Sequence, residues 1–141
     1  MLKTIVVALD DSELSERVIQ TLQEIQLQPA TKIILSHVIS PPESNLEIAD
    51  RPHADSEFLP YLHIEKQLQS YQANLPGESE IEIVIGDPAE EIIRLANIYQ
   101  ADLIVIGSRG LTGVKRILQG SVSSQVVEDA ACSVLVVKSD S

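Results

Sequence analysis

The stretch that decides the fold is LKTIVVALDDSELSERVIQTLQEIQ, residues 2–26. Residues 2–9 form a nearly continuous run of apolar and β-branched side chains, which is typical of a strand covered on both faces and therefore of a parallel sheet. Apolar residues then recur at helical spacing, namely Leu14, Val18, Leu22 and Ile25. Asp10 and Glu13 are spaced as a capping pair, so the pattern predicts a helix that begins directly at the carboxyl end of the strand.

The same alternation continues along the rest of the chain. Further strands are predicted at residues 32–39, 80–86, 102–107 and 133–138, and further helices at residues 56–75, from Pro88 onward and at about 121–130. The boundary at Asp87 is the sharpest, because Asp87 suits the N-cap, Pro88 the first helical position and Glu90 a capping box.

Five strands that alternate with four helices predict an α/β domain. Because crossovers between parallel strands are right-handed, we expect an open, doubly wound, five-stranded parallel sheet with helices on both faces, Rossmann-like or flavodoxin-like, with strand order 3-2-1-4-5. A length of 141 residues suits one domain, residues 1–141, with a polar variable loop at about residues 40–56. The alternating acids of residues 80–86 indicate a strand nearer the sheet edge, and the acids of GESEIE, residues 77–82, a solvated face.

Composition limits the partners and the compartment. Ten basic and 21 acidic residues give a formal net charge of -11, which would repel nucleic-acid phosphates and anionic lipids, so neither a nucleic acid nor a membrane is expected as partner. No apolar run approaches the roughly 18 residues that span a bilayer. The single cysteine, Cys132, excludes an internal disulfide, and a cytoplasmic location is expected.

Residues 107–123, GSRGLTGVKRILQGSVS, contain four of the six glycines. No Asp or Glu occurs from Leu103 to Val127, whereas three basic residues do, namely Arg109, Lys115 and Arg116. The stretch is not a P-loop, because no lysine follows Gly120, and the chain has no G-x-G-x-x-G. This is the one locally cationic segment of an acidic chain.

Two interpretations of this stretch remain open from the residues alone. Gly107 and Gly110 directly follow a strand, and Gly120, Ser121 and Ser123 are expected at the start of a helix, whose free N–H groups and dipole favour an anion. Alternatively, the glycines only end a strand and serve turns, and the serines only cap a helix. The lack of acids favours an anion site.

The predicted sheet indicates where a ligand would bind. In doubly wound sheets, ligands lie outside the carboxyl ends of the strands, at the point where strand order reverses. This rule selects Asp10, residues 37–39 and the chain from Gly107 onward. If the first and fourth strands are neighbours, Asp10 and the glycine-rich stretch face one crevice.

The sequence DLIVIGSRGLTGVKRILQGSVSSQVVEDAACSVLVV, residues 102–137, resembles the C-terminal signature of the universal stress protein family. The nucleotide-binding branch of that family carries G-x-x-G, nine residues and then G-[ST]. Gly107, Gly110, Gly120 and Ser121 match every fixed position at this spacing. The resemblance extends to IVVALDDSELSERVI near the N-terminus, LSHVI in the second strand and GDPAEEII.

The resemblance implies that the chain binds ATP, with ADP or AMP as possibilities, and that Mg²⁺ accompanies the nucleotide beside Asp10. The residues that it assigns to nucleotide binding are Ala8, Asp10, Val38, Ile106, Gly107, Arg109, Gly110, Gly120, Ser121, Val122 and Ser123. Glycines allow backbone amides to approach phosphate oxygens, and the serines add hydroxyl donors, which agrees with this assignment.

The function implied is a regulatory stress-response module that acts through its nucleotide-bound state and a homodimer paired through residues 133–138. Ser133 departs from the family, which often has proline there, and leaves the register of pairing open. No residue is assigned a catalytic role, since phosphoryl transfer requires positioned cations that the chain does not display. The alternatives are a slow ATPase or nucleotide-dependent transferase, and a nucleotide-free interaction module.

Histidines and the cysteine receive structural interpretations. His37 is interpreted as a structural hydrogen-bonding residue near the crevice. His53 and His63 have no nearby cysteine, so no metal cage is indicated there. Cys132 is interpreted as a small core residue, with a redox role as the alternative.

Overall fold

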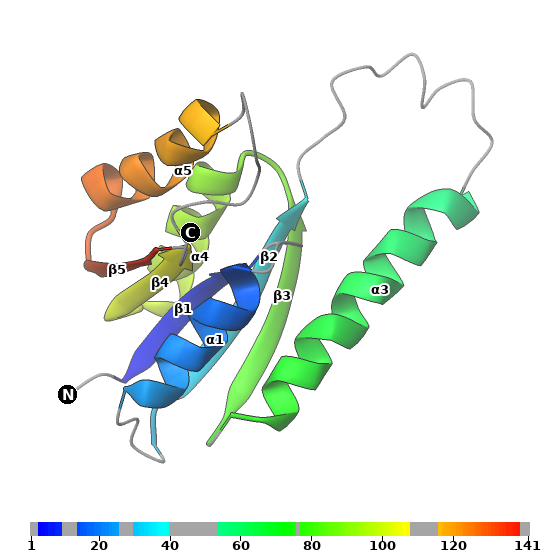
Figure 1. The fold of residues 1–141 in the computed structure, drawn as a ribbon, viewed down its shortest axis with the longest axis horizontal. Coiled ribbons are helices and arrows are strands. Elements are labelled where there is room, and N and C mark those ends of the chain that lie inside the picture. The colour runs from blue at the N-terminus through cyan, green and yellow to red at the C-terminus, as the bar shows by residue number, and fades with distance from the viewer. Residues whose placement is uncertain are drawn as a thin grey trace.

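Strands and helices alternate along the chain in a computed structural model that describes residues 3–9, 14–25, 30–39, 54–75, 77–107 and 116–138 (Figure 1). The elements in order are β1 (Thr4–Leu9), α1 (Leu14–Glu24), β2 (Lys32–Ile39), α3 (Ala54–Ala73), β3 (Ser79–Ile85), α4 (Pro88–Tyr99), β4 (Leu103–Gly107), α5 (Arg116–Asp129) and β5 (Ser133–Val137). The bounds of β2 are those that the sequence predicts.

The strands form one parallel sheet in the order β3-β2-β1-β4-β5. The predicted fold class and strand order are therefore confirmed. The first strand lies at the centre of the sheet, paired with β2 on one side and with β4 on the other. The order of strands thus reverses between β1 and β4, as the ligand rule for such sheets requires.

Helices cover both faces of the sheet (Figure 1). Side chains of a strand alternate between faces, so neighbouring residues of β1 enter different cores. On the α1/α3 face, Ile5 and Val7 pack in one cluster with α1 and α3, whereas on the α4/α5 face Val6 packs in a second cluster with α4 and α5. These three side chains are fully buried, which explains the continuous apolar run of the first strand.

The start of α4 is as the sequence predicts. Asp87 is the N-cap, and its carboxylate accepts a hydrogen bond of 3.0 Å from the backbone N–H of Glu90. Pro88 occupies the first turn, where its missing N–H costs nothing. The predicted capping residue Asp10 lies outside the described residues.

Two other helix boundaries differ from the prediction. The helix α5 begins at Arg116, five residues before the expected start at Ser121. The reason is that arginine, leucine and glutamine favour helix, and one interior glycine costs only about 1 kcal/mol relative to alanine. The prediction that Gly120 and Ser121 open this helix is therefore wrong, because they lie in its second turn. The helix α3 spans Ala54–Ala73 instead of residues 56–75.

Candidate functional site

Three strand ends meet at the carboxyl edge of the sheet, beside the point where strand order reverses. Ala8 and Ile106 are direct partners across β1 and β4, and Gly107 is the last residue of β4. Val38 is the penultimate residue of β2. The structure therefore brings together the residues that the sequence assigns to the ends of these strands.

The side chains of this edge share one face of the sheet. Ile106 is 5% exposed and belongs to the core cluster on the α4/α5 face, and Ala8, Val38 and Val122 are partly buried against the same cluster. Val122 comes from α5, so three strands and a helix contribute. Ser123, the next residue of α5, is buried. The arrangement is an apolar wall with small residues at its rim, which suits a flat, largely apolar group better than a metal ion.

Other residues of the predicted site cannot be placed at this edge. Asp10, Arg109 and Gly110 lie outside the described residues. Gly120 and Ser121 lie within α5, one turn after its start. The part of the site expected to hold phosphate and Mg²⁺ therefore rests on the sequence motif alone.

The ends of β1 and β2 are joined by two hydrogen bonds from side chains. Ser36 Oγ donates to the carbonyl oxygen of Val7 over 2.8 Å. His37 Nδ1 lies 3.0 Å from the carbonyl oxygen of Leu9, and because that oxygen can only accept, Nδ1 donates. The structural interpretation of His37 is confirmed. The hydrogen bond of Ser36 is not among the predicted features. Its signal in the sequence is a hydroxyl within the apolar run KIILSHVI, which must find a partner when it is buried.

A polar cluster covers the amino-terminal half of β3. Tyr99 of α4 donates a hydrogen bond to Glu82, which raises the pKa of Tyr99 to about 12, with burial adding to the effect. Lys32 pairs with Glu80 over 2.7 Å and lies 5.4 Å from the centre of the Tyr99 ring. Glu80 is exposed, as expected for a solvated face, whereas Glu82 is half-buried and bonded to Tyr99, so the expectation does not hold for Glu82. β3 is an edge strand, as predicted.

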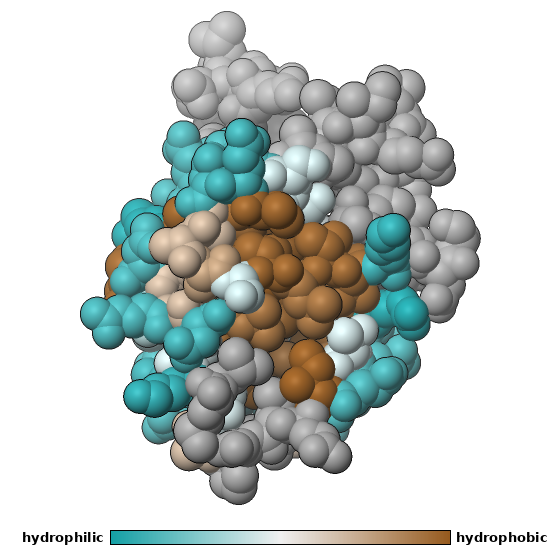
Figure 2. Space-filling view, turned by 90° about the vertical axis from the view of Figure 1, so that its left-hand side faces the viewer, coloured by the Kyte–Doolittle hydropathy of each residue, from teal (hydrophilic) through white to brown (hydrophobic). Residues whose placement is uncertain are grey.

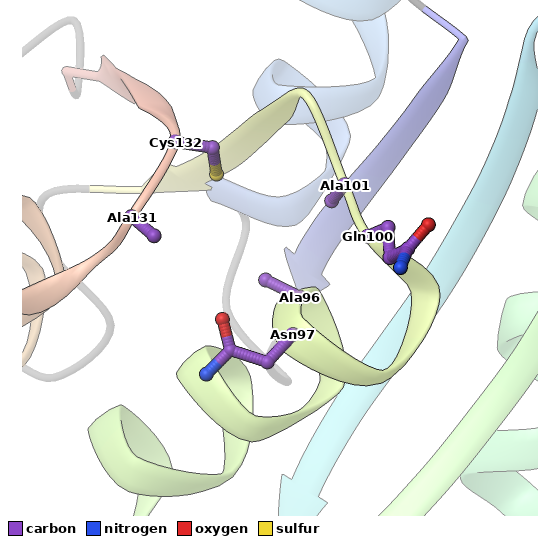
Figure 3. A pocket seen from close by; sticks show the side chains of 6 residues that line it. All are labelled: Ala96, Asn97, Gln100, Ala101, Ala131 and Cys132. Atoms are coloured by element: carbon purple, nitrogen blue, oxygen red, sulfur yellow. The ribbon is translucent and has the colours of Figure 1, made fainter.

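A pocket of about 250 Å³ lies at the opposite end of the sheet, between the carboxyl end of α4 and the start of β5 (Figure 3). Its lining consists of small and amide side chains, namely Ala96, Asn97, Gln100, Ala101, Ala131 and Cys132. Partial burial raises the pKa of the Cys132 thiol, which keeps it protonated and a poor nucleophile. Cys132 also packs against the α4/α5 core, as a small core residue would.

Within the described ranges, no group of three or more His, Cys, Asp or Glu side chains is arranged to hold a metal ion. Among the same residues, no helix has the length and apolar character needed to cross a membrane.

The sheet and its flanking helices define a Rossmann-like α/β domain, and comparison with known proteins identifies the family. Residues 1–138 match the universal stress protein family. The chain belongs to the universal stress protein family.

Individual relatives agree over nearly the full length. Universal stress protein Sll1388 of Synechocystis sp. is 30% identical over 95% of this chain and 96% of its own. Universal stress protein MJ0577 of Methanocaldococcus jannaschii is 31% identical over 98% and 96% of the two chains. A solved structure of MJ0577 superposes with a TM-score of 0.84, covering 99% of this chain and 98% of that one at 29% identity.

A further solved structure is described as a universal stress protein in complex with cAMP. It superposes with a TM-score of 0.68 at 26% identity, and the match covers 97% of each chain.

Proposed function

We propose that this protein binds an adenine nucleotide, namely ATP, with ADP or AMP as alternatives, at the carboxyl edge of β1, β2 and β4, and that it acts as a regulatory stress-response module. The observation that carries the proposal is the shared apolar wall of Ala8, Val38, Ile106 and Val122. The family membership and the relative bound to cAMP support it.

The wall suits the adenine and ribose for a physical reason. A purine ring is flat and mostly apolar on its faces, so it gains from contact with aliphatic side chains at a sheet edge. Ala8 and Gly107, from the neighbouring strands β1 and β4, are small and leave room for it. The phosphates are assigned to Arg109, Gly110, Gly120, Ser121 and Ser123 by the sequence motif, with Asp10 beside a nucleotide-bound Mg²⁺.

The proposed activity is binding, with slow ATP hydrolysis as its upper limit. The motif supplies backbone amides and hydroxyls but no P-loop lysine, and efficient phosphoryl transfer needs positioned cations. A signal would then pass through the bound state to a partner or to a second copy of the chain. The single cysteine fits the reducing cytoplasm, where we expect the protein to act.

The second copy is proposed to pair along β5. This strand lies at one edge of the sheet, and its residues Val134, Leu135 and Val136 are only partly buried. The side of the molecule on which β5 lies in Figure 1 carries an apolar patch bordered by hydrophilic residues (Figure 2). An apolar edge strand that stays unpaired favours aggregation, and pairing with the same strand of a second copy across a two-fold axis covers it.

The binding proposal is tested by titrating the purified protein with ATP, ADP, AMP and cAMP by isothermal calorimetry. The chain has no Trp and three Tyr, so nucleotide that is carried through purification is also visible as absorbance near 260 nm. Saturable binding of an adenine nucleotide is expected. No heat, no thermal shift and no carried nucleotide would refute the proposal and favour a nucleotide-free interaction module.

A matched pair of variants tests the phosphate assignment. Ser121→Glu adds a negative charge where the motif places phosphate, and it is expected to abolish ATP binding without unfolding the domain. Ser124→Glu adds the same charge at an exposed position of the same helix and is expected to leave binding unchanged. Equal affinity of both variants would exclude the phosphate site. ADP release measured over hours, with and without Mg²⁺, separates binding from hydrolysis.

A further inference from the structure

The two side-chain hydrogen bonds between β2 and β1 lie at the strand ends that carry the proposed site. Ser36 and His37 are consecutive, so the alternation of side chains places Ser36 toward the α4/α5 face and His37 toward the α1/α3 face. Both donate to carbonyl oxygens of β1, those of Val7 and Leu9. The end of β1 is therefore held from both faces.

Because these hydrogen bonds are buried, breaking them costs more free energy than breaking a hydrogen bond at the surface. Ser36 is fully buried and His37 is 8% exposed, so neither donor can be satisfied by bulk water without opening the structure. A carbonyl oxygen has two lone pairs, which allows it to accept from a side chain in addition to a ladder N–H. Breaking either bond leaves a buried polar group without its partner.

The position of the His37 bond connects it to ligand binding. Leu9 is the last residue of β1 and directly follows Ala8, and His37 directly precedes Val38. In the sheet register, Leu9 and His37 are partners. Strand ends open more readily than strand centres, so a buried bond at the last pair reduces the movement of both neighbouring site residues.

We propose that His37 is a positioning residue for the nucleotide, holding the Leu9 carbonyl through Nδ1–H so that Ala8 and Val38 stay in the geometry that receives the adenine. The inference rests on the proposed function. His37 acts through the strand ends and needs no contact with the ligand. Its contribution is preorganisation, which lowers the ordering that binding would otherwise require.

The test compares three variants for ATP binding and thermal stability. His37→Leu keeps bulk and removes the donor. His37→Asn places an amide N–H at a position equivalent to Nδ1. Ile33→Val removes one carbon from the α1/α3 core at the other end of β2 and controls for a general loss of stability. His37→Leu is expected to weaken ATP binding about fivefold, which is the scale of one lost hydrogen bond. His37→Asn is expected to restore most of the affinity, and Ile33→Val to bind as the wild type does.

A spectroscopic measurement on the nucleotide-free protein keeps the inference testable even if a variant folds poorly. Long-range ¹H–¹⁵N spectra of histidine-labelled wild type are expected to show a proton on Nδ1 of His37, because the carbonyl oxygen of Leu9 can only accept a hydrogen bond. An Nδ1 without a proton would overturn the inference. Equal weakening by His37→Leu and Ile33→Val, or no recovery in His37→Asn, would also overturn it. A wild type that binds no nucleotide refutes the proposed function itself, and is thereby distinguished from failure of the role of His37.

Discussion

Thr4 and Asp102, 98 residues apart in sequence, exchange two hydrogen bonds. The backbone N–H of Asp102 donates to the carbonyl oxygen of Thr4 over 2.8 Å, and the backbone N–H of Thr4 donates to Asp102 Oδ2 over 3.1 Å. Asp102 Oδ2 also accepts from the N–H of Lys3 over 2.8 Å. The start of β1 is therefore fixed to the start of β4, which sets the register of the strand pair that carries the proposed site.

Replacing Asp102 is expected to lower the stability of the protein near neutral pH. The N–H groups of Lys3 and then Thr4 lower the pKa of the Asp102 carboxyl from its ordinary 3.8. Because the folded-state pKa is the lower one, the stabilisation is fully present above the unfolded value and is lost as the pH falls through the folded value. Urea unfolding of Asp102→Ala at pH 7 should give a lower midpoint than the wild type, and the difference should vanish in strong acid.

Asp102→Asn is the matched control for that measurement. It retains an acceptor oxygen without the charge, so its stability at pH 7 should lie between those of the wild type and Asp102→Ala. A midpoint of Asp102→Ala equal to that of the wild type at pH 7 would contradict the assigned role.

Tyr99→Phe tests the hydrogen bond between α4 and β3. The variant keeps the ring beside Lys32 and loses the hydroxyl that donates to Glu82, so a loss of roughly 1 kcal/mol of unfolding free energy is expected. The pKa of Tyr99 is raised from 10.0 to about 12, so the stabilisation is complete below pH 10 and is lost as the pH rises to about 12. Absorbance at 295 nm should show one of the three tyrosines ionising late. Uniform ionisation near pH 10 would argue against the bond.

Gln100→Gly is expected to stabilise the protein. Gln100 ends α4 in the left-handed conformation, with φ 53° and ψ 51°, and the adjoining N–H of Ala101 bonds to the carbonyl of Ala96 over 2.8 Å. A side chain costs about 1 kcal/mol in this conformation, and glycine avoids that cost. Thermal unfolding should show a higher midpoint for Gln100→Gly, whereas Gln100→Ala, which keeps a Cβ, should show no such gain. An equal rise of the unfolding midpoint in both variants would mean that the loss of the Gln100 side-chain amide, and not the relief of backbone strain, causes the stabilisation.

Leu135→Lys tests the proposed dimer. A lysine in the middle of β5 can keep its alkyl stem on the core while its charge opposes pairing of two identical edges. Sedimentation velocity should find a wild-type dimer and a monomeric Leu135→Lys variant. Ile85→Lys, at the 70% exposed end of the opposite edge strand β3, should remain dimeric. A monomeric wild type at high concentration would rule out the interface.

Local signals in the sequence predicted most of the fold. The bounds of β2 and the Asp87 cap follow from apolar runs and capping chemistry, which act over a few residues. The start of α5 does not follow from the local pattern, because Gly120 and Ser121 are typical of a helix start, whereas the helix formers before them extend the helix to Arg116. Of the site, the strand-end residues could be placed because parallel strands meet at one edge. The hydrogen bonds of Ser36 to Val7 and of Tyr99 to Glu82 could not be predicted from the sequence, because only the assembled sheet brings these groups together.

The central position of β1 also has a consequence for synthesis. The chain makes this strand first, but the pairing with β4 that completes its second edge joins Ile5 to Leu103. Until β4 leaves the ribosome, a nascent chain that has already paired β1 with β2, and β2 with β3, exposes one edge of β1. Long-range pairings of this kind form slowly and leave edges open to aggregation. The pairing that creates the proposed ligand edge is therefore also the step that covers the second edge of β1.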